Sequence, residues 1–259
     1  RRIGRDKCYI VDFTEGCKDA NDVLMSYGPE LLDECFQNAR PYPVEGVFGL
    51  EDVRDEMLDV FDNGKKKGLT TGYPELNPHY TFRLSEFDVF TGIPGHGKTS
   101  FALQLMMNAS ILYGWKWGVF SPENYPINEL FDGLIELYIG KTSDIDSPTR
   151  MSKEEYVHGM HFLKNHFYAV YPEKDFTMKS VLDRFQFLVR RKGIKGVLVD
   201  PFNQLDHDFG SRSEANYIAD ALNTIRRFTK SHDLKFIVVA HPITMRGATA
   251  GSGDNDVPT

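Results

Sequence analysis

Residues 92–99 read Gly-Ile-Pro-Gly-His-Gly-Lys-Thr and match the pattern G-x-x-x-x-G-K-[ST] at every fixed position. In such a loop the glycines let several backbone N–H groups point at phosphate oxygens, the lysine reaches the β- and γ-phosphates, and the hydroxyl binds Mg²⁺. A buried strand is expected over 86–92 and an apolar helix over 99–113. A glycine-rich turn could also occur without any ligand. The order of strand, loop and helix is the context that the motif requires, and it favours a nucleotide-binding site.

The expected ligands of this site are ATP or another nucleoside triphosphate, and Mg²⁺. Lys98 would bind the phosphates, and the Thr99 hydroxyl would bind the metal. The positive N-terminal end of the following helix would attract the same phosphates. The residues expected to contact the nucleotide are Gly92, Pro94, Gly95, His96, Gly97, Lys98, Thr99 and Ser100.

The composition limits the partners of the chain. Its 259 residues carry a formal net charge of −7, which argues against a broadly basic surface and leaves any DNA contact to a few local residues or to an assembled channel. Three cysteines, Cys8, Cys17 and Cys35, fit no zinc or redox spacing and suit a reducing compartment. No apolar run approaches membrane-spanning length, so no membrane partner is expected. Because the chain begins with Arg1, we expect a fragment of a longer protein.

From residue 86 onward, strand and helix patterns alternate, as a mainly parallel sheet flanked by helices requires. The strand runs are short and apolar, which suits strands buried on both faces. A capping box formed by Ser152 and Glu155 is expected to begin the third helix. Strands are predicted at 87–92, 116–121, 166–171, 194–200 and 235–241, and helices at 98–113, 127–139, 152–164, 178–192 and 213–231.

Three of the predicted strands end in a residue that can take part in chemistry. Ligands of such sheets lie beyond the carboxyl ends of the strands, so these three side chains are expected near the phosphates. Asp200 would support Mg²⁺, Glu123 would polarise the attacking water as a general base, and His241 would sense the γ-phosphate. The simpler interpretations are a common strand-end aspartate, a solvated loop acid and a capped strand end.

The residues before the core form two further segments. Residues 1–46 contain a strand-like run at 8–13 and a predicted helix over about 22–38, too little to bury a core alone. Within 47–67, the segment 49–66 is predicted to be helical, with an apolar stripe at Leu50, Val53, Met57 and Phe61. This stripe docks either on its own core or on a neighbouring subunit.

The order of P-loop, strand-end Glu, strand-end Asp and strand-end His resembles the RecA-like core of the DnaB class of hexameric replicative helicases. Within that class the pattern is most similar to phage primase–helicases and to Twinkle-like proteins. We expect the location to be the cytoplasm, that of a phage-infected host cell, in preference to the mitochondrial matrix. Residues 68–77 look like the segment that opens this core, and 15–22 resemble the closing motif of the TOPRIM primase fold. The resemblance therefore implies a TOPRIM-like remnant at 1–46, a subunit-linking helix at 47–67 and an α/β RecA-like P-loop core at 68–259.

The resemblance also implies roles for individual residues. Lys98 and Thr99 would bind nucleotide and Mg²⁺, Glu123 would be the catalytic base, Asp200 the Mg²⁺-linked acid and His241 the phosphate sensor. The loops 203–214 and 242–257 would line a channel for single-stranded DNA in a hexameric ring. Their candidate DNA-binding residues, which also fit ordinary surface positions, are Asn203, Arg212 and Arg246.

Two departures from the family pattern and two rival functions remain. The acidic metal-binding motifs of TOPRIM are absent, so we expect no primer synthesis. The chain ends at Thr259, before the position of the family's arginine finger, so we expect slow hydrolysis of the nucleotide. A RecA-type recombinase or a clock-type ATPase would share the core but not the TOPRIM-like lead-in or the linking helix. A non-catalytic assembly module, in which nucleotide binding alone drives ring formation, would lack DNA-stimulated hydrolysis.

Overall fold

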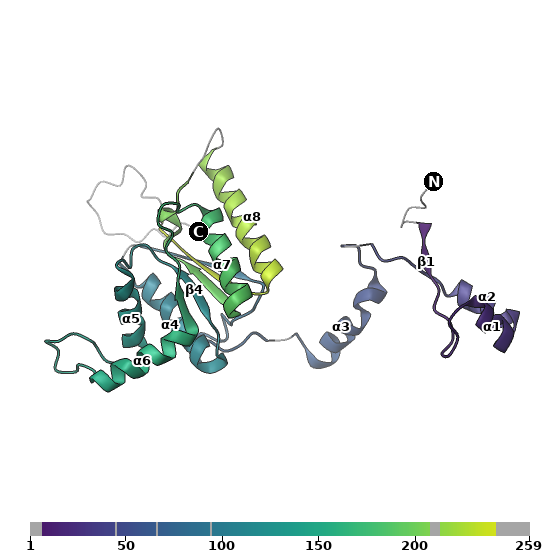
Figure 1. Cartoon of the computed structure of the whole chain (residues 1–259), viewed down its shortest axis with the longest axis horizontal. Helices are drawn as coiled ribbons and strands as arrows, with labels where there is room; N and C mark the ends of the chain where they lie inside the picture. Colours follow the sequence, from purple (N-terminus) through teal and green to yellow (C-terminus); the bar gives the residue numbers. More distant parts are fainter. Residues whose placement is uncertain (1–6, 45, 66, 94, 208–212, 242–259) are drawn as a thin grey trace. The chain divides into compact units, whose positions relative to one another are not determined.

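Among the described residues, five parallel strands form one sheet, as the alternating pattern predicts, and their order in the sheet is β3-β7-β6-β4-β5. The computed structural model of the protein describes residues 7–44, 46–65, 67–93, 95–207 and 213–241. It divides the chain into two units, Arg1–Lys66 and Lys67–Thr259, and the sheet lies in the second (Figure 1). The strands are β3 (Phe87–Thr91), β4 (Trp117–Phe120), β5 (Phe167–Ala169), β6 (Gly196–Val199) and β7 (Lys235–Ala240).

Helices cover both faces of this sheet, and each face has its own apolar cluster (Figure 1). Successive strand residues point to opposite faces, so Leu198 packs in the cluster with α4, α5 and α6 while Val197 and Val199 pack in the cluster with α7 and α8. The capping box is present, with Ser152 and Glu155 each accepting the other's backbone N–H. The helices are α4 (Lys98–Tyr113), α5 (Ile127–Ile139), α6 (Lys153–His166), α7 (Met178–Lys192) and α8 (Glu214–His232).

A short lead-in precedes the first strand of the sheet. Leu69 and Phe82 form an antiparallel bridge through two backbone hydrogen bonds of 2.8 Å. The buried Phe82 ring packs in the cluster with α4, and the Asn108 side chain on that helix donates to the carbonyl of Thr71. The lead-in is thereby tied to the helix that follows the P-loop.

The smaller unit contains a break that the pattern over 22–38 did not reveal. Instead of one helix there are two, α1 (Ala20–Tyr27) and α2 (Pro29–Gln37). Gly28 has a φ of 89°, which ends α1, and Pro29 lacks the N–H that a continuous helix would need. The prediction of a single helix was therefore wrong at this point.

The other described elements of the smaller unit are one antiparallel pair of short strands and one longer helix. The expected strand at 8–13 is shorter, with β1 (Tyr9–Ile10) pairing antiparallel to β2 (Arg40–Pro41). The third helix is α3 (Leu50–Asn63), whose first turn is capped by the Asp52 carboxylate accepting the backbone N–H of Gly49 at 2.6 Å. Among the described residues no helix is long and apolar enough to cross a bilayer.

Gly196 provides a test of the sheet's packing. It pairs in register with Trp117, whose fully buried ring lies over it, so that a Cβ added at Gly196 would be 2.1 Å from Cζ3 of that ring. We expect Gly196→Ala to lower the free energy of unfolding by about 3 kcal/mol, because a packed core cannot absorb the added carbon. The measurement is urea unfolding followed by tryptophan fluorescence.

Gly133→Ala is the matched control for this substitution. Gly133 lies inside α5, and an added Cβ there meets no atom of the described residues within 4 Å. Alanine should therefore stabilise the protein by about 0.5–1 kcal/mol through helix propensity. Equal effects of the two substitutions would contradict the packing of Trp117 on Gly196.

Candidate functional site

The loop between β3 and α4 carries the phosphate-binding pattern. Gly97, the N-cap residue of α4, has a φ of 75°, a conformation that a residue with a Cβ adopts only with strain. No side chain among the described residues caps the first turn of this helix. The N–H groups at the start of α4 therefore retain the capacity to bind an anion.

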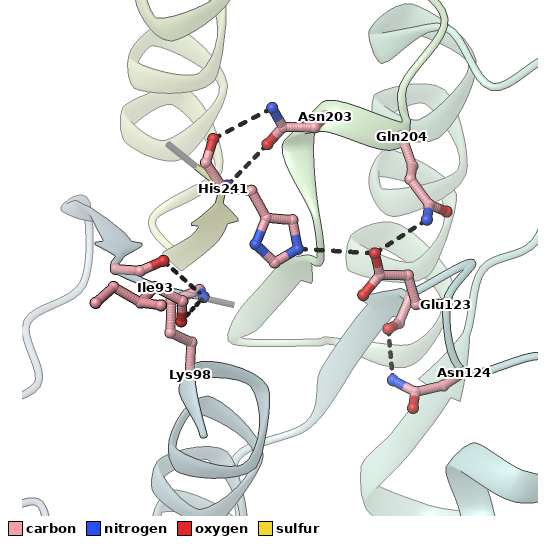
Figure 2. A network of polar contacts seen from close by, with 9 residues as sticks. Ile93, Lys98, Glu123, Asn124, Asn203, Gln204 and His241 are labelled. Atoms are coloured by element: carbon pink, nitrogen blue, oxygen red, sulfur yellow. Dashed lines mark hydrogen bonds and ion pairs between the residues drawn. The ribbon is translucent and has the colours of Figure 1, made fainter. Parts of the chain in front are cut away.

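Lys98 is held over this loop by the loop itself (Figure 2). Its Nζ donates to the carbonyl oxygens of Gly92 at 2.9 Å and Ile93 at 3.0 Å. The ammonium group is thus fixed against the loop that carries the phosphate-binding pattern.

Asp200 follows β6, the central strand, and is 1% exposed. Its backbone N–H donates to the carbonyl of Phe120 on β4 at 2.9 Å, which fixes the start of its side chain. Burial raises the pKa of the carboxyl group, and the nearby Glu123 carboxylate raises it further, while the Thr99 hydroxyl, His241 and Lys98 lower it. Its Oδ1 is buried and has no hydrogen-bond partner among the residues that the structure describes.

This unpartnered oxygen fits a Mg²⁺ ion that is held jointly with nucleotide phosphates. Mg²⁺ is usually bound by one or two protein oxygens together with water and phosphate. Asp200 and the Thr99 hydroxyl supply such a pair. Within the described part of the chain there is no group of three or more His, Cys, Asp or Glu side chains that could hold a metal by themselves.

Glu123 lies in the loop that follows β4 and is half-exposed. Two groups approach the same carboxylate oxygen, Oε1: Nε2 of Gln204 donates to it at 3.0 Å, and Nε2 of His241 lies 3.7 Å away (Figure 2). The loop itself is closed by the Asn124 side chain, which donates to Oγ of Ser121 at 2.7 Å. The carboxylate is thus positioned by residues from two other strand ends.

His241 comes directly after β7, and its main chain is held by one side chain. Oδ1 of Asn203 accepts the N–H of His241 at 2.8 Å, and Nδ2 of Asn203 donates to its carbonyl at 3.3 Å (Figure 2). The imidazole Nδ1 is buried and unpartnered among the described residues. Its Nε2 faces Glu123, so the other ring nitrogen, Nδ1, is the one available for a polar ligand.

The structure brings most of the residues predicted from sequence to one place. Lys98, Thr99, Glu123 and His241 all lie close enough to Asp200 to affect its pKa. The remaining loop residues, Gly92, Gly95, His96, Gly97 and Ser100, belong to the loop and the start of α4. Pro94, Arg212 and Arg246 lie outside the described residues. Asn203 uses its amide to hold His241, and DNA binding by Asn203 stays a prediction.

Gln204 is the residue of this site that the sequence did not reveal. It ends the short 3₁₀ helix η2 (Phe202–Gln204), which begins two residues after Asp200. A polar pair at the end of a buried strand is the only signal that could have drawn attention to it. Its partner Glu123 is 81 residues away in the sequence, so no local pattern links them.

Comparisons with known proteins give one relative that spans most of the chain. No protein-family model matches. The Twinkle homolog protein, chloroplastic/mitochondrial, of Arabidopsis thaliana is 37% identical over 256 residues, which cover 93% of this chain. The primase homolog protein of the same plant is 48% identical over 50 residues, or 17% of this chain and 15% of that protein.

Solved structures share the fold at low sequence identity. An ATPase domain has a TM-score of 0.62 and 16% identity, with 75% of this chain and 72% of that chain covered. A DnaB-like replicative helicase has a TM-score of 0.59 and 15% identity, with 85% of this chain and 55% of that chain covered. The chain spans only 36% of the length of the Twinkle homolog. The resemblance carried by the motifs is confirmed: this chain is related to the Twinkle homolog, and its core has the fold of DnaB-like replicative helicases.

Proposed function

We propose that this chain contains the ATP-hydrolysing core of a ring-forming replicative DNA helicase that is part of a primase–helicase. The proposal depends above all on one observation, the meeting of Lys98, Glu123 and Asp200 at the carboxyl edge of a parallel sheet. The sequence relation to the Twinkle homolog supports a helicase over a recombinase or a clock-type ATPase. A non-catalytic assembly module is left as an outcome of the experiments below.

In this proposal the P-loop binds the phosphates of ATP or another nucleoside triphosphate. The backbone N–H groups and Lys98 face the phosphate oxygens, and the start of α4 adds its positive end. Thr99 and Asp200 hold Mg²⁺, which when bound neutralises charge on the β- and γ-phosphates. Asp200 is already buried and lacks a partner for Oδ1 among the described residues, so metal binding requires little rearrangement of the protein.

Glu123 acts as the general base of hydrolysis. A carboxylate that accepts the proton of a water molecule must be held within hydrogen-bond reach of it, and Gln204 and His241 restrict where this carboxylate lies. His241 follows the last strand of the sheet and donates to the γ-phosphate when nucleotide is present. In this proposal the two neighbouring side chains act on the same reacting phosphate, one through the water and one through a hydrogen bond.

Single-stranded DNA is the proposed polymer substrate, and a hexameric ring of identical subunits is the proposed assembly. The overall charge of −7 disfavours binding on an outer surface and favours a local, channel-lining site. The loops 203–214 and 242–257 are the proposed DNA contacts. A cytoplasmic location stays a prediction, and the name of the Arabidopsis relative assigns that protein to chloroplasts and mitochondria.

Replacing Glu123 tests the chemistry. In the full-length protein, Glu123→Gln should lower single-stranded-DNA-stimulated ATP hydrolysis by about 10²-fold or more, because the general base is lost. Binding of a fluorescent ATP analogue should persist, since this residue does not contact the phosphates directly. Lys98→Ala is the matched control and should abolish that binding.

Each of these results has an opposite that would count against the proposal. Hydrolysis at the wild-type rate in Glu123→Gln would make Glu123 an ordinary loop acid. Unchanged nucleotide affinity in Lys98→Ala, measured by calorimetry, would contradict the assignment of the P-loop as the phosphate-binding site. Nucleotide binding in the wild type without any hydrolysis, with or without DNA, would favour the non-catalytic assembly module.

Replacing Asp200 tests the metal site through stability. Burial raises the pKa of the Asp200 carboxyl group, so this group binds its proton more tightly in the folded state than in the unfolded state. The free energy of unfolding of the wild type therefore falls as the pH rises from the pKa of an ordinary aspartate through the raised pKa. Without nucleotide, Asp200→Asn should raise Tm at pH 7.5 by about 2–4 °C, and by less at pH 4.5. With Mg²⁺ and ATP the wild type should gain more Tm than the variant.

Asp183→Asn on the exposed face of α7 is the control for this comparison and should leave Tm unchanged. If Asp200→Asn lowers Tm without nucleotide, the buried carboxylate stabilises the fold. That result would contradict the proposal that Asp200 destabilises the free protein and is retained because it binds the metal. If Mg²⁺ and ATP raise Tm equally in the wild type and in Asp200→Asn, Asp200 does not bind the metal.

Helix α3 provides the test of ring formation. Its stripe is not covered within its own unit, since Phe61 is 86% exposed and Leu50 and Met57 are also exposed. Burying such side chains against a neighbour contributes roughly 1.5–3 kcal/mol each before the entropy cost of association. We expect Val53→Asp/Phe61→Asp to convert rings of the full-length protein to monomers, measured by light scattering.

The control for this double variant lies on the opposite side of α3. Asp55→Ala/Asp59→Ala changes as many positions but leaves the stripe intact, so rings should persist. Circular dichroism and nucleotide binding should be unchanged in both variants. Rings that survive Val53→Asp/Phe61→Asp would indicate that α3 packs on its own subunit.

A further inference from the structure

Two adjacent amide side chains in η2 connect different parts of the nucleotide site (Figure 2). Asn203 makes both of its hydrogen bonds to the main chain of His241, and Gln204 donates to the carboxylate of Glu123. One short turn after β6 therefore contacts the ends of β7 and β4. These contacts join residues 38 and 81 positions apart in the sequence.

The contact of Gln204 is selective for one oxygen of Glu123. Nε2 of Gln204 lies 3.0 Å from Oε1, and the nearest approach of the His241 ring, at 3.7 Å, is to the same atom. Neither of these two contacts involves the second oxygen, Oε2. Holding one oxygen fixes the rotation of the carboxylate about its last bond, a torsion that is otherwise broad.

Glu123 needs such a restraint because it lies on a loop and is 44% exposed. The charged groups that approach it are Asp200 after β6 and, when protonated, His241 after β7. Asp200 repels the carboxylate, whereas a protonated His241 attracts it. Without a fixed donor the side chain would follow this balance of charges and not the direction of the attacking water.

We propose that Gln204 is a positioning residue for Glu123, holding Oε1 so that Oε2 faces the attacking water, while Asn203 holds His241 from the same turn. This inference rests on the proposed function, in which Glu123 is the general base. Gln204 touches no phosphate in this arrangement and acts through Glu123. Its removal therefore affects kcat and not the binding of nucleotide.

Three substitutions at Gln204 separate its donor group from its volume. Gln204→Met keeps the length and removes the donor, Gln204→Lys keeps a donor, and Gln204→Glu replaces the donor by a second negative charge. In the full-length protein we expect kcat to fall about 10-fold in the Met variant, less in the Lys variant and most in the Glu variant. KM for ATP should stay within about twofold of the wild type in all three.

A double variant tests whether Gln204 acts through Glu123. In a Glu123→Gln background, Gln204→Met should cause no further loss of kcat, because there is no carboxylate left to hold. The control Gln186→Met on α7 should match the wild type. Wild-type kcat in Gln204→Met, equal losses in all three single variants, or a further 10-fold loss in the double variant would each overturn the inference.

Hydrogen exchange separates this inference from the proposed function. If the wild type hydrolyses no nucleotide, the proposed function fails while the restraint can still be measured. Exchange of the amides in residues 121–126 should then be faster in Gln204→Met than in the wild type and in Gln186→Met. Unchanged exchange in that segment would overturn the restraint itself.

Discussion

The buried carboxylate of Asp200 is the constraint on which the rest of the site depends. An ionised group that is 1% exposed is costly to the fold unless it is paired, and its Oδ1 has no partner in the described part of the chain. The same burial raises the pKa of the Asp200 carboxyl group, because it disfavours the ionised form. Destabilising buried groups of this kind are common at binding and catalytic sites, where the bound ligand stabilises the ionised form.

The strand order explains why the other groups gather around this carboxylate. Asp200 follows β6, the middle strand, whose neighbours β4 and β7 lead to Glu123 and His241, and β3 beyond β7 leads into the P-loop. Because all five strands are parallel, these four chain segments leave the sheet at the same edge. The apolar interiors of the strands fix the edge, and polar residues that follow β3, β4, β6 and β7 form the candidate site.

Much of this arrangement can be predicted from the sequence, because it follows from local patterns. Apolar runs predict the five strands, the glycine-rich loop predicts where the candidate phosphate site lies, and the strand ends point to Glu123, Asp200 and His241, which the structure brings together. Two features could not be found in this way. The break between α1 and α2 depends on Gly28 adopting a positive φ before Pro29, inside a run that otherwise has helical spacing. The bond from Gln204 to Glu123 joins distant segments, and no periodicity encodes it.

The site contains two kinds of polar group, and the difference between them follows from what each must do. Groups that must be placed are held by the protein: Lys98 by two loop carbonyls, Glu123 by Gln204, and the main chain of His241 by Asn203. Groups suited to bind a ligand lack partners among the described residues, as do Oδ1 of Asp200 and Nδ1 of His241. Preorganised positions with unsatisfied binding atoms lower the reorganisation needed when a charged ligand enters. The same division is what a site for phosphate and metal requires, while the surrounding sheet supplies the stability that such unpartnered groups lack.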